Sequence, residues 1–240
     1  MTRGIFYLPP DTSSSDIIGG GTSALAILYP GTRTVLKISH GDPDEDARCE
    51  LEAQIYDLLS KSQFSRPTSL LEYKGRSSCG RGILLGYAEN HTVRRYLQHG
   101  ARLPDTTVIC RWANQAALGL RFLHMNGIGH RDVNCDNLFL DKDLNVQLGD
   151  FTSSSLHLNS AQREDDLFEL GLALYEMCTG VQPFKGMFYS VDDKRAEFLK
   201  GISPDLSHVA LGKFKSPISK CLNAQYKDTE ELVLDLSTCK

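Results

Sequence analysis

Apolar residues in the first 90 positions come in short runs that are separated by turn residues. One run covers residues 24–29, and an alternating run covers residues 34–38 after a Pro-Gly turn. Two more short runs follow at 69–73 and 82–87, joined by a stretch rich in Gly and Ser. Short apolar runs bounded by such turns are typical of β-strands. We therefore expect a small sheet in this part of the chain.

A helix is expected between the second and third of these strands. The acidic stretch at 42–46 contains Pro43, and both features favour the first turn of a helix. Apolar residues then recur at helical spacing as far as Lys61. These residues are Leu51, Ile55, Leu58 and Leu59.

The second half of the chain is patterned as helices. Residues 108–125 carry their apolar side chains on one stripe and stop at Gly127, and the strongly apolar segment 165–179 stops at Gly180. Glycine is common directly after the last turn of a helix. Weaker helical patterns lie at 191–200, 217–223 and 229–236.

The order of these elements predicts an α+β fold in two lobes. The sheet and its helix would form an N-terminal lobe over residues 1–88, and the later helices a larger C-terminal lobe over 89–240, because strands followed by helices segregate in this way. With 240 residues, 41% of them hydrophobic, the chain can bury a core of this size.

Charge and cysteine content narrow the class of protein. The 26 Lys and Arg against 30 Asp and Glu give a net charge of −4, which offers no overall basic field to nucleic acid. The seven cysteines are scattered without a C-x-x-C pair, which argues against a disulfide framework and favours a reducing compartment. No apolar stretch reaches the roughly 18 residues of a membrane span. We therefore expect a cytoplasmic protein.

The sequence between the two long helices carries the most distinctive chemistry. H-R-D at 130–132 is followed by Asn137, then by two short apolar strands around a turn, and then by D-F at 150–151. This order and spacing resembles the catalytic loop and the metal-binding motif of protein kinases. The resemblance covers about residues 19–236 and is greatest to small fungal kinase-domain proteins.

The resemblance implies ATP and Mg²⁺ as ligands and phosphoryl transfer as the reaction. Asp132 would orient the attacking hydroxyl, and Asn137 and Asp150 would bind the metal, since Mg²⁺ prefers hard oxygen donors. Each of these residue types is also common in turns for backbone reasons, and it is the joint spacing that favours the catalytic interpretation. By the same resemblance, Asp166 would anchor the catalytic loop from the following helix.

The N-terminal lobe would supply the partners of the phosphates. Lys37 resembles the strand lysine that binds the α- and β-phosphates, although a lone strand lysine is ordinarily a solvated surface charge. Glu52 resembles the helix glutamate that holds this lysine. Glu50 is the competing assignment, and the helical phase of Ile55 and Tyr56 favours Glu52.

The remaining ATP-binding residues are assigned by resemblance as well. Gly19, Gly20 and Gly21 would form the glycine-rich phosphate loop, with Ala24 in place of its third glycine. A flexible linker is the alternative interpretation of these glycines. The adenine pocket would consist of Ala26, Val35, Leu85, Gly86, Ala88 and Phe139. Ordinary core packing would explain these apolar residues equally well.

Three further features depart from the kinase pattern. Thr152 follows the D-F pair where glycine is usual, which restricts the backbone there. The cation that the family carries two or four residues after the catalytic aspartate is missing, because those positions are Asn134 and Asp136. Residues 153–165 are too few for the family's activation segment, and they contain no A-P-E motif.

These observations leave three functional hypotheses. The first is an ATP-dependent serine/threonine protein kinase with impaired activity. The second is a pseudokinase that binds ATP or acts as a scaffold. The third is a small-molecule kinase of the aminoglycoside-phosphotransferase type, against which the H-R-D triplet and Phe151 argue. We expect a monomer whose partners are ATP and a protein substrate or binding partner, with no nucleic acid and no membrane.

Overall fold

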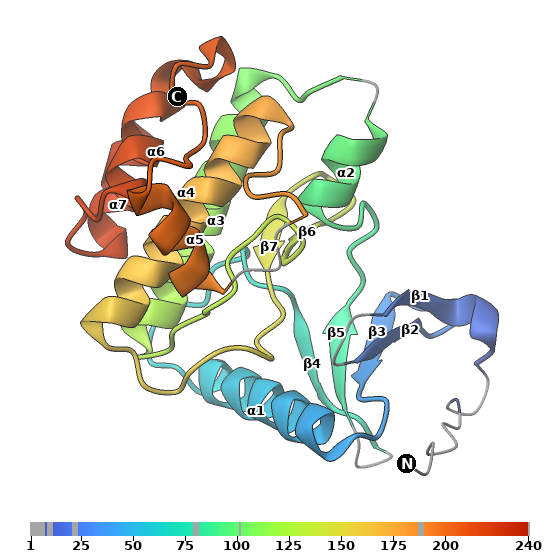
Figure 1. Cartoon of the computed structure of the whole chain (residues 1–240). Coiled ribbons are helices and arrows are strands. Elements are labelled where there is room, and N and C mark those ends of the chain that lie inside the picture. The colour runs from blue at the N-terminus through green and yellow to red at the C-terminus, as the bar shows by residue number, and fades with distance from the viewer. Residues whose placement is uncertain are drawn as a thin grey trace.

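The chain folds into an N-terminal sheet with one long helix and a larger helical part (Figure 1). The computed structural model describes residues 8, 12–20, 24–78, 82–100, 102–186 and 190–239. This arrangement confirms the expected α+β fold in two lobes. The predicted lobe boundary near residue 88 stays a prediction.

Within the described residues, five antiparallel strands form the N-terminal sheet in the order β1-β2-β3-β5-β4. A short 3₁₀ helix, Ser14–Asp16, precedes the first strand. The strands are β1 (Ile17–Gly20), β2 (Leu25–Leu28), β3 (Thr34–Ile38), β4 (Tyr73–Arg76) and β5 (Ile83–Gly86). Three of them fall inside the predicted runs, whereas β1 was not expected because two isoleucines followed by glycines show no alternation.

The strand predicted at 69–73 is wrong. Residues 69–71 instead run beside the C-terminal part of the molecule, where Leu71 N donates to Leu148 O at 3.0 Å and Leu148 N donates to Ser69 O at 2.8 Å. The chain joins the N-terminal sheet only at Tyr73, as β4. The apolar run is therefore a contact between the two parts of the molecule, and not a strand of the sheet.

The register of the sheet decides which residues face the cleft. Ala26 lies opposite Lys37, and Val35 lies opposite Leu85. Directly opposed residues of antiparallel strands share a face, and Val35 and Lys37 share one because they are two positions apart. The opposite face buries a separate small core of Ile27, Leu36 and Ile38.

Helix α1 (Pro43–Ser60) matches the helix predicted from the acidic stretch. The Asp42 side chain caps its N-terminus by accepting from Asp44 N at 2.9 Å, and Pro43 is the first helical residue. The buried face includes Glu52, Tyr56 and Leu59, all on one stripe at helical spacing. Glu52 is thereby turned toward the sheet.

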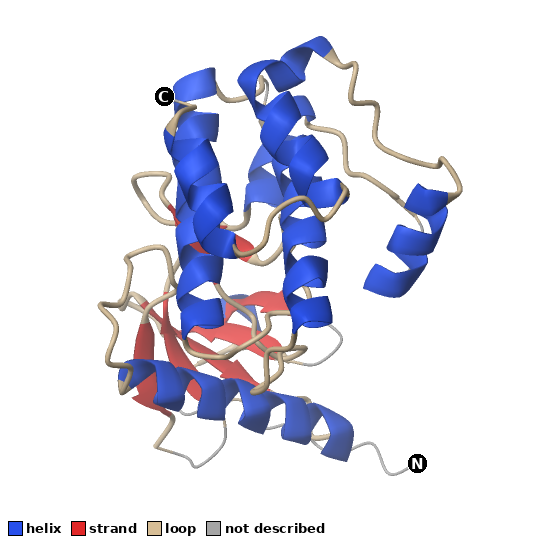
Figure 2. Ribbon diagram, turned by 90° about the vertical axis from the view of Figure 1, so that its left-hand side faces the viewer, coloured by secondary structure: helices blue, strands red, loops and turns tan. Residues whose placement is uncertain are grey.

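The helical part is built around two long helices that run side by side (Figure 2). Its helical segments are α2 (Val93–His99), α3 (Thr106–Met125), α4 (Ser160–Thr179), α5 (Val191–Leu199), the 3₁₀ segment Val209–Phe214, α6 (Lys215–Leu222) and α7 (Thr229–Ser237). Between α3 and α4 lies the hairpin of β6 (Leu138–Leu140) and β7 (Val146–Leu148). None of the described helices is long and apolar enough to cross a membrane.

Two of these helices differ from the predictions. Helix α4 begins at Ser160, five residues earlier than expected, because Asn159 and Gln162 form a capping box there. Helix α2 was not predicted at all, since its seven residues carry too few apolar positions to show a helical stripe. This short helix nevertheless contributes residues to the lining of the cleft.

Candidate active site

A cavity of about 700 Å³ separates the sheet from the helical part. Residues from both parts line it. Of the residues predicted from the sequence, Gly19, Gly20, Ala26, Val35, Lys37, Glu52, Leu85, Gly86, Ala88, Asp132, Asn137, Phe139 and Asp150 line this cavity. Gly21 lies outside the described residues. The fold thus brings together side chains that are more than 100 positions apart in the sequence.

Lys37 lies between two carboxylates at the inner end of the cavity. Its Nζ is 2.7 Å from Glu52 Oε2 and 2.9 Å from Asp150 Oδ1. Burial alone would lower the pKa of Lys37, but the two carboxylates outweigh it and raise that pKa, so the lysine stays charged. Burial also raises the pKa of Glu52, which is 1% exposed.

The competing assignment, Glu50, lies elsewhere. Its carboxylate accepts two hydrogen bonds from the Arg76 guanidinium, at 2.8 and 3.0 Å, on the exposed side of α1. The expected facing of Lys37 and Glu52 is therefore present, and Glu50 takes no part in it.

Glu52 has a second partner that the sequence did not reveal. Its Oε1 accepts from Phe151 N at 3.1 Å, next to Asp150. The Phe151 ring is fully buried between Tyr56 of α1, at 4.8 Å between ring centroids, and His130, at 5.6 Å. Helix α1, the D-F pair and the H-R-D triplet are thus packed as one unit. No periodicity in the sequence signals such a contact between distant segments.

Asp150 is held in a strained backbone conformation, with φ at +63°. Its Oδ1 accepts from the Thr152 hydroxyl at 2.7 Å as well as from Lys37. Burial would raise the pKa of Asp150, but Lys37 and the Thr152 hydroxyl outweigh it and lower that pKa to about 2. Thr152 departs from the kinase pattern, and in this structure it fixes the orientation of the carboxylate.

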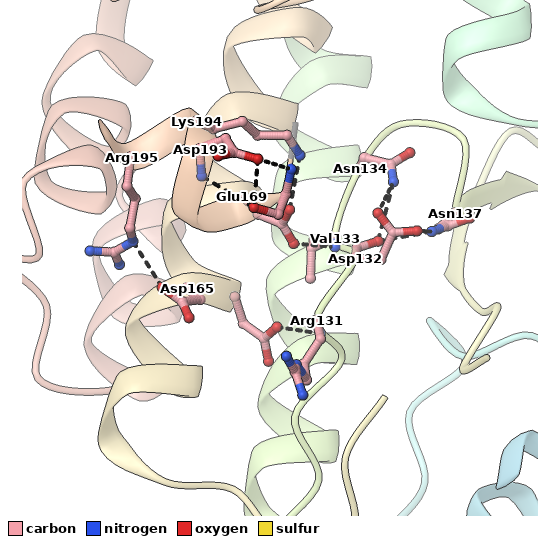
Figure 3. Close-up of polar contacts among 12 residues, drawn as sticks. Arg131, Asp132, Val133, Asn134, Asn137, Asp165, Glu169, Asp193, Lys194 and Arg195 are labelled. Carbon is pink, nitrogen blue, oxygen red and sulfur yellow. Dashed lines mark hydrogen bonds and ion pairs between the residues drawn. The ribbon is translucent and has the colours of Figure 1, made fainter. Parts of the chain in front are cut away.

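Asp132 accepts hydrogen bonds from two side-chain amides (Figure 3). Asn134 Nδ2 donates to its Oδ1 at 2.8 Å, and Asn137 Nδ2 donates to its Oδ2 at 2.9 Å. An amide thus occupies position 134, where the kinase pattern has a cation. The Asp132 carboxylate is oriented by neutral donors alone among the described residues.

The catalytic loop is anchored from α4 by two buried carboxylates. Asp166 accepts from His130 N at 2.8 Å and from Arg131 N at 2.6 Å, which is the anchoring contact implied by the resemblance. Glu169, one turn later, accepts from Val133 N at 2.9 Å and is paired with Lys194 of α5 at 3.0 Å (Figure 3). No pattern in the sequence indicated the Glu169 contact, because a buried carboxylate within an apolar helix looks the same in the sequence as an exposed one.

The short segment after Asp150 runs back along the catalytic loop. Ser155 and Gly129 exchange two backbone hydrogen bonds of 2.8 and 3.0 Å, and the Ser154 hydroxyl donates to His130 O at 3.0 Å. The chain then enters α4 at Ser160. Residues 153–159 therefore pack against the loop and leave no extended segment before α4.

Comparisons with known proteins agree with this geometry. The family model of the protein kinase domain matches residues 34–162, a little over half of the chain. Serine/threonine-protein kinase Nek3 of rice is 28% identical over 202 residues, which cover 73% of this chain and 34% of that protein. Serine/threonine-protein kinase Nek6 of rice is 35% identical over 95 residues, 36% of this chain and 17% of that protein.

A fungal relative is similar over a shorter part of its own length. Cytokinesis protein sepH of Emericella nidulans is 26% identical over 165 residues, which cover 57% of this chain and 12% of that protein. This chain thus spans about a third or less of each of these relatives. The family model, the two-lobed fold and the order of the site residues lead to one conclusion: the chain belongs to the protein kinase family.

Proposed function

We propose that the protein is an ATP-dependent serine/threonine protein kinase whose phosphoryl transfer is slow. One observation carries the proposal: the Lys37 ammonium lies within 3 Å of carboxylate oxygens of both Glu52 and Asp150. These three residues line the same cavity as Asp132. Phosphoryl transfer depends mainly on positioning and on neutralising charge, and this cluster suits both tasks.

In the proposed reaction, Lys37 binds the α- and β-phosphates while Glu52 holds its ammonium group in place. The apolar residues Ala26, Val35 and Phe139 sandwich the purine. All three line the same cavity, as does Leu85. Asp132 accepts the hydroxyl proton of a serine or threonine and orients its oxygen toward the phosphorus.

The donors at the metal position fit Mg²⁺. Asp150 Oδ2 and Asn137 Oδ1 form no hydrogen bond within the described part of the chain, so both oxygens are available to a cation. Mg²⁺ usually takes one or two protein oxygens and completes its shell with phosphates and water. When bound, Mg²⁺ would neutralise charge on the phosphates.

The slow rate follows from the charge around Asp132. An amide at Asn134 adds no positive charge to offset the negative charge that develops on the phosphoryl group, and loss of one such stabilising group costs about 10²–10³ in rate. The same observation favours a second candidate function, an ATP-binding pseudokinase, in which nucleotide is bound and transfer is absent.

Two measurements test the proposal. Mg²⁺-ATP should raise the melting temperature, because a ligand that binds the native state stabilises it by mass action. Lys37→Ala should weaken this shift, and Asp150→Asn should remove most of its dependence on Mg²⁺. Transfer of labelled phosphate to a mixture of serine and threonine peptides should be detectable and should disappear in Asp132→Asn.

The outcomes separate the alternatives. A melting shift without any transfer would assign the protein to the pseudokinases. The absence of a shift at millimolar Mg²⁺-ATP would contradict both functions. Transfer at the roughly 1–100 s⁻¹ of ordinary kinases would contradict the proposed impairment.

A further inference from the structure

Helix α5 is attached to the outside of α4 by side-chain contacts. Arg195 pairs with Asp165 at 2.8 Å, and Lys194 pairs with Glu169 at 3.0 Å (Figure 3). None of the nine residues of α5 is buried. The helix therefore lies at the surface of the helical part, and its ion pairs with α4 help to set its position.

One of these ion pairs continues to the catalytic loop. Lys194 Nζ donates to Glu169 Oε1 at 3.0 Å, and Val133 N donates to the second oxygen, Oε2, at 2.9 Å. Val133 directly follows Asp132. Asp165, the other α4 carboxylate that meets α5, forms no hydrogen bond with the loop within the described part of the chain. Helix α5 and the backbone beside Asp132 are thus joined through the carboxylate of Glu169.

This contact complements the anchor that Asp166 provides. Asp166 accepts from His130 N and Arg131 N, which precede Asp132, whereas Glu169 accepts from the amide that follows it. The direction of the Asp132 side chain is set by the two peptide units on either side of its Cα atom. The two carboxylates of α4 therefore fix the backbone on both sides of Asp132.

Glu169 depends on Lys194 because it is buried. Its side chain is 3% exposed. Burial raises the pKa of Glu169, as does the nearby charge of Asp132, whereas Lys194 lowers it. An ionised carboxylate is costly to bury unless it is paired and hydrogen-bonded. Without the Lys194 ammonium group, Glu169 would take up a proton more readily and would accept a weaker hydrogen bond from Val133 N.

Solvent reaches this ion pair through a small cavity. The cavity has a volume of about 200 Å³, and Val133, Glu169 and Lys194 are part of its lining. The Lys194 side chain is 21% exposed. Two further charged groups at this cavity, Arg94 of α2 and Glu176 of α4, pair with each other at 2.8 Å. The ionisation of Glu169 can thus follow the pH of the solution, with Lys194 as the cation paired with it.

On the basis of the proposed kinase function, we propose that Lys194 is a positioning residue for Asp132. It acts through Glu169 and the Val133 amide, because Lys194 itself is absent from the lining of the large cleft. A displacement of α5 would loosen the hydrogen bond to Val133 N and shift the neighbouring Asp132. Small errors in the position of a reacting group lower the rate strongly. Helix α5 is therefore a place from which the rate of transfer can be controlled.

The first test follows the Val133 amide by NMR in the full chain labelled with isotope-enriched valine. An amide proton that is donated to a carboxylate changes its chemical shift when the carboxylate takes up a proton, so this signal reports the ionisation of Glu169. We expect the signal to titrate in the wild type and to stop titrating in Glu169→Gln. In Lys194→Met the midpoint should move to a higher pH, and Lys194→Arg should restore the midpoint of the wild type.

The second test measures phosphate incorporation from mildly acidic to mildly alkaline pH. Lys194→Met should lower kcat about tenfold at neutral pH and leave the KM for ATP unchanged, because the change acts on Asp132 and not on the phosphate site. The loss should shrink as the pH rises, since Glu169 then ionises without a cation beside it. Lys200→Met is the matched control, because the partner of Lys200, Glu197, lies on α5 itself. It should keep the rate and the pH profile of the wild type.

Three results would overturn the inference. The first is a Val133 signal that still titrates in Glu169→Gln, or one whose midpoint is unchanged in Lys194→Met. The second is equal slowing by Lys194→Met and Lys200→Met, because α5 would then act through its packing alone. The third is a full further loss of rate when Lys194→Met is added to Glu169→Gln, since Lys194 would then act by another route.

The two proposals can fail separately. The Val133 signal is measured without ATP and without transfer, and Glu169→Gln leaves no carboxylate buried at this position. A protein that titrates as expected but transfers no phosphate would contradict the proposed function and retain the coupling of α5 to the catalytic loop. A protein that transfers phosphate but shows no change in the Val133 midpoint would retain the function and lose the coupling.

Discussion

The sheet side of the cleft and its catalytic-loop side balance their charges differently. On the sheet side, the Lys37 ammonium lies within 3 Å of two carboxylates, and one of them also accepts a backbone N–H. On the loop side, the Asp132 carboxylate meets only the amides of Asn134 and Asn137 among the described side chains. An ammonium group thus lies between carboxylates on the sheet side, and no cation contacts the Asp132 carboxylate among the described side chains. We therefore expect that mutations can separate the proposed nucleotide binding from the proposed phosphoryl transfer.

The largest expected effect is on transfer alone. Asp132→Asn should lower the rate of phosphate incorporation by about 10²-fold or more, because general base catalysis contributes about that much. The rise in melting temperature with Mg²⁺-ATP should stay the same, since Asp132 is not among the groups proposed to bind phosphate. Single-turnover incorporation and thermal melting measure the two quantities. A parallel loss of both would mean that the two sides are not separable.

The loop side can also be tested by adding the missing charge. Asn134→Lys should raise the transfer rate about tenfold, because an ammonium group beside Asp132 would neutralise charge on the phosphoryl group. Asn134→Gln, which lengthens the side chain without adding charge, is the matched control and should show no gain. If Asn134→Lys is no faster than the wild type, the short segment 153–159 and not the missing cation limits the rate.

On the sheet side, two glutamates of α1 are expected to contribute differently to the stability of the protein. Glu52→Gln should lower the free energy of unfolding by about 3 kcal/mol, since it removes one carboxylate partner of the buried Lys37. Glu50→Gln should lower it by at most about 1 kcal/mol, because the Glu50–Arg76 pair is exposed to solvent. Urea unfolding of both variants measures the difference. Equal losses would contradict the buried role of Glu52.

The periodicity of apolar residues predicted those helices and strands whose buried face follows from their own sequence. Helices α1 and α3 and strands β2 and β3 fall where apolar periodicity indicates them. The prediction failed where a tertiary contact decides the structure. Residues 69–71 have the composition of a strand, yet they pair with Leu148 in the other part of the molecule. Helix α2 is stabilised by its packing beside β6, which no pattern within seven residues can reveal.

The residues of the candidate site that belong to spaced sequence motifs could be predicted from the sequence. The spacing from Asp132 to Asp150 is enough to indicate one site, and the cavity lining brings Lys37 to it. The Glu169 contact with Val133 could not be predicted in the same way. It depends on which face of α4 is turned toward the loop that carries Asp132, and this is decided by long-range packing.

The smallest expected effect concerns Thr152, which lies where the two sides meet. Its hydroxyl donates to Asp150 Oδ1 at 2.7 Å, so it helps to orient the carboxylate that is proposed to bind Mg²⁺. Thr152→Gly removes this hydrogen bond and also frees the backbone next to Asp150. We expect the Mg²⁺ concentration needed for half of the ATP-dependent melting shift to rise about threefold, because water at this part-buried position replaces most of the lost hydrogen bond to the ionised carboxylate.

Two further variants separate the hydroxyl from the branched side chain. Thr152→Ser keeps the hydroxyl and should bind Mg²⁺ like the wild type, whereas Thr152→Val keeps the shape and should behave like Thr152→Gly. If Thr152→Val is unchanged and only the glycine variant is weaker, backbone stiffness and not the hydrogen bond orients Asp150. In that case Thr152 would orient Asp150 by restricting the backbone, as a glycine at this position would not. The low pKa of Asp150 would then depend mainly on Lys37.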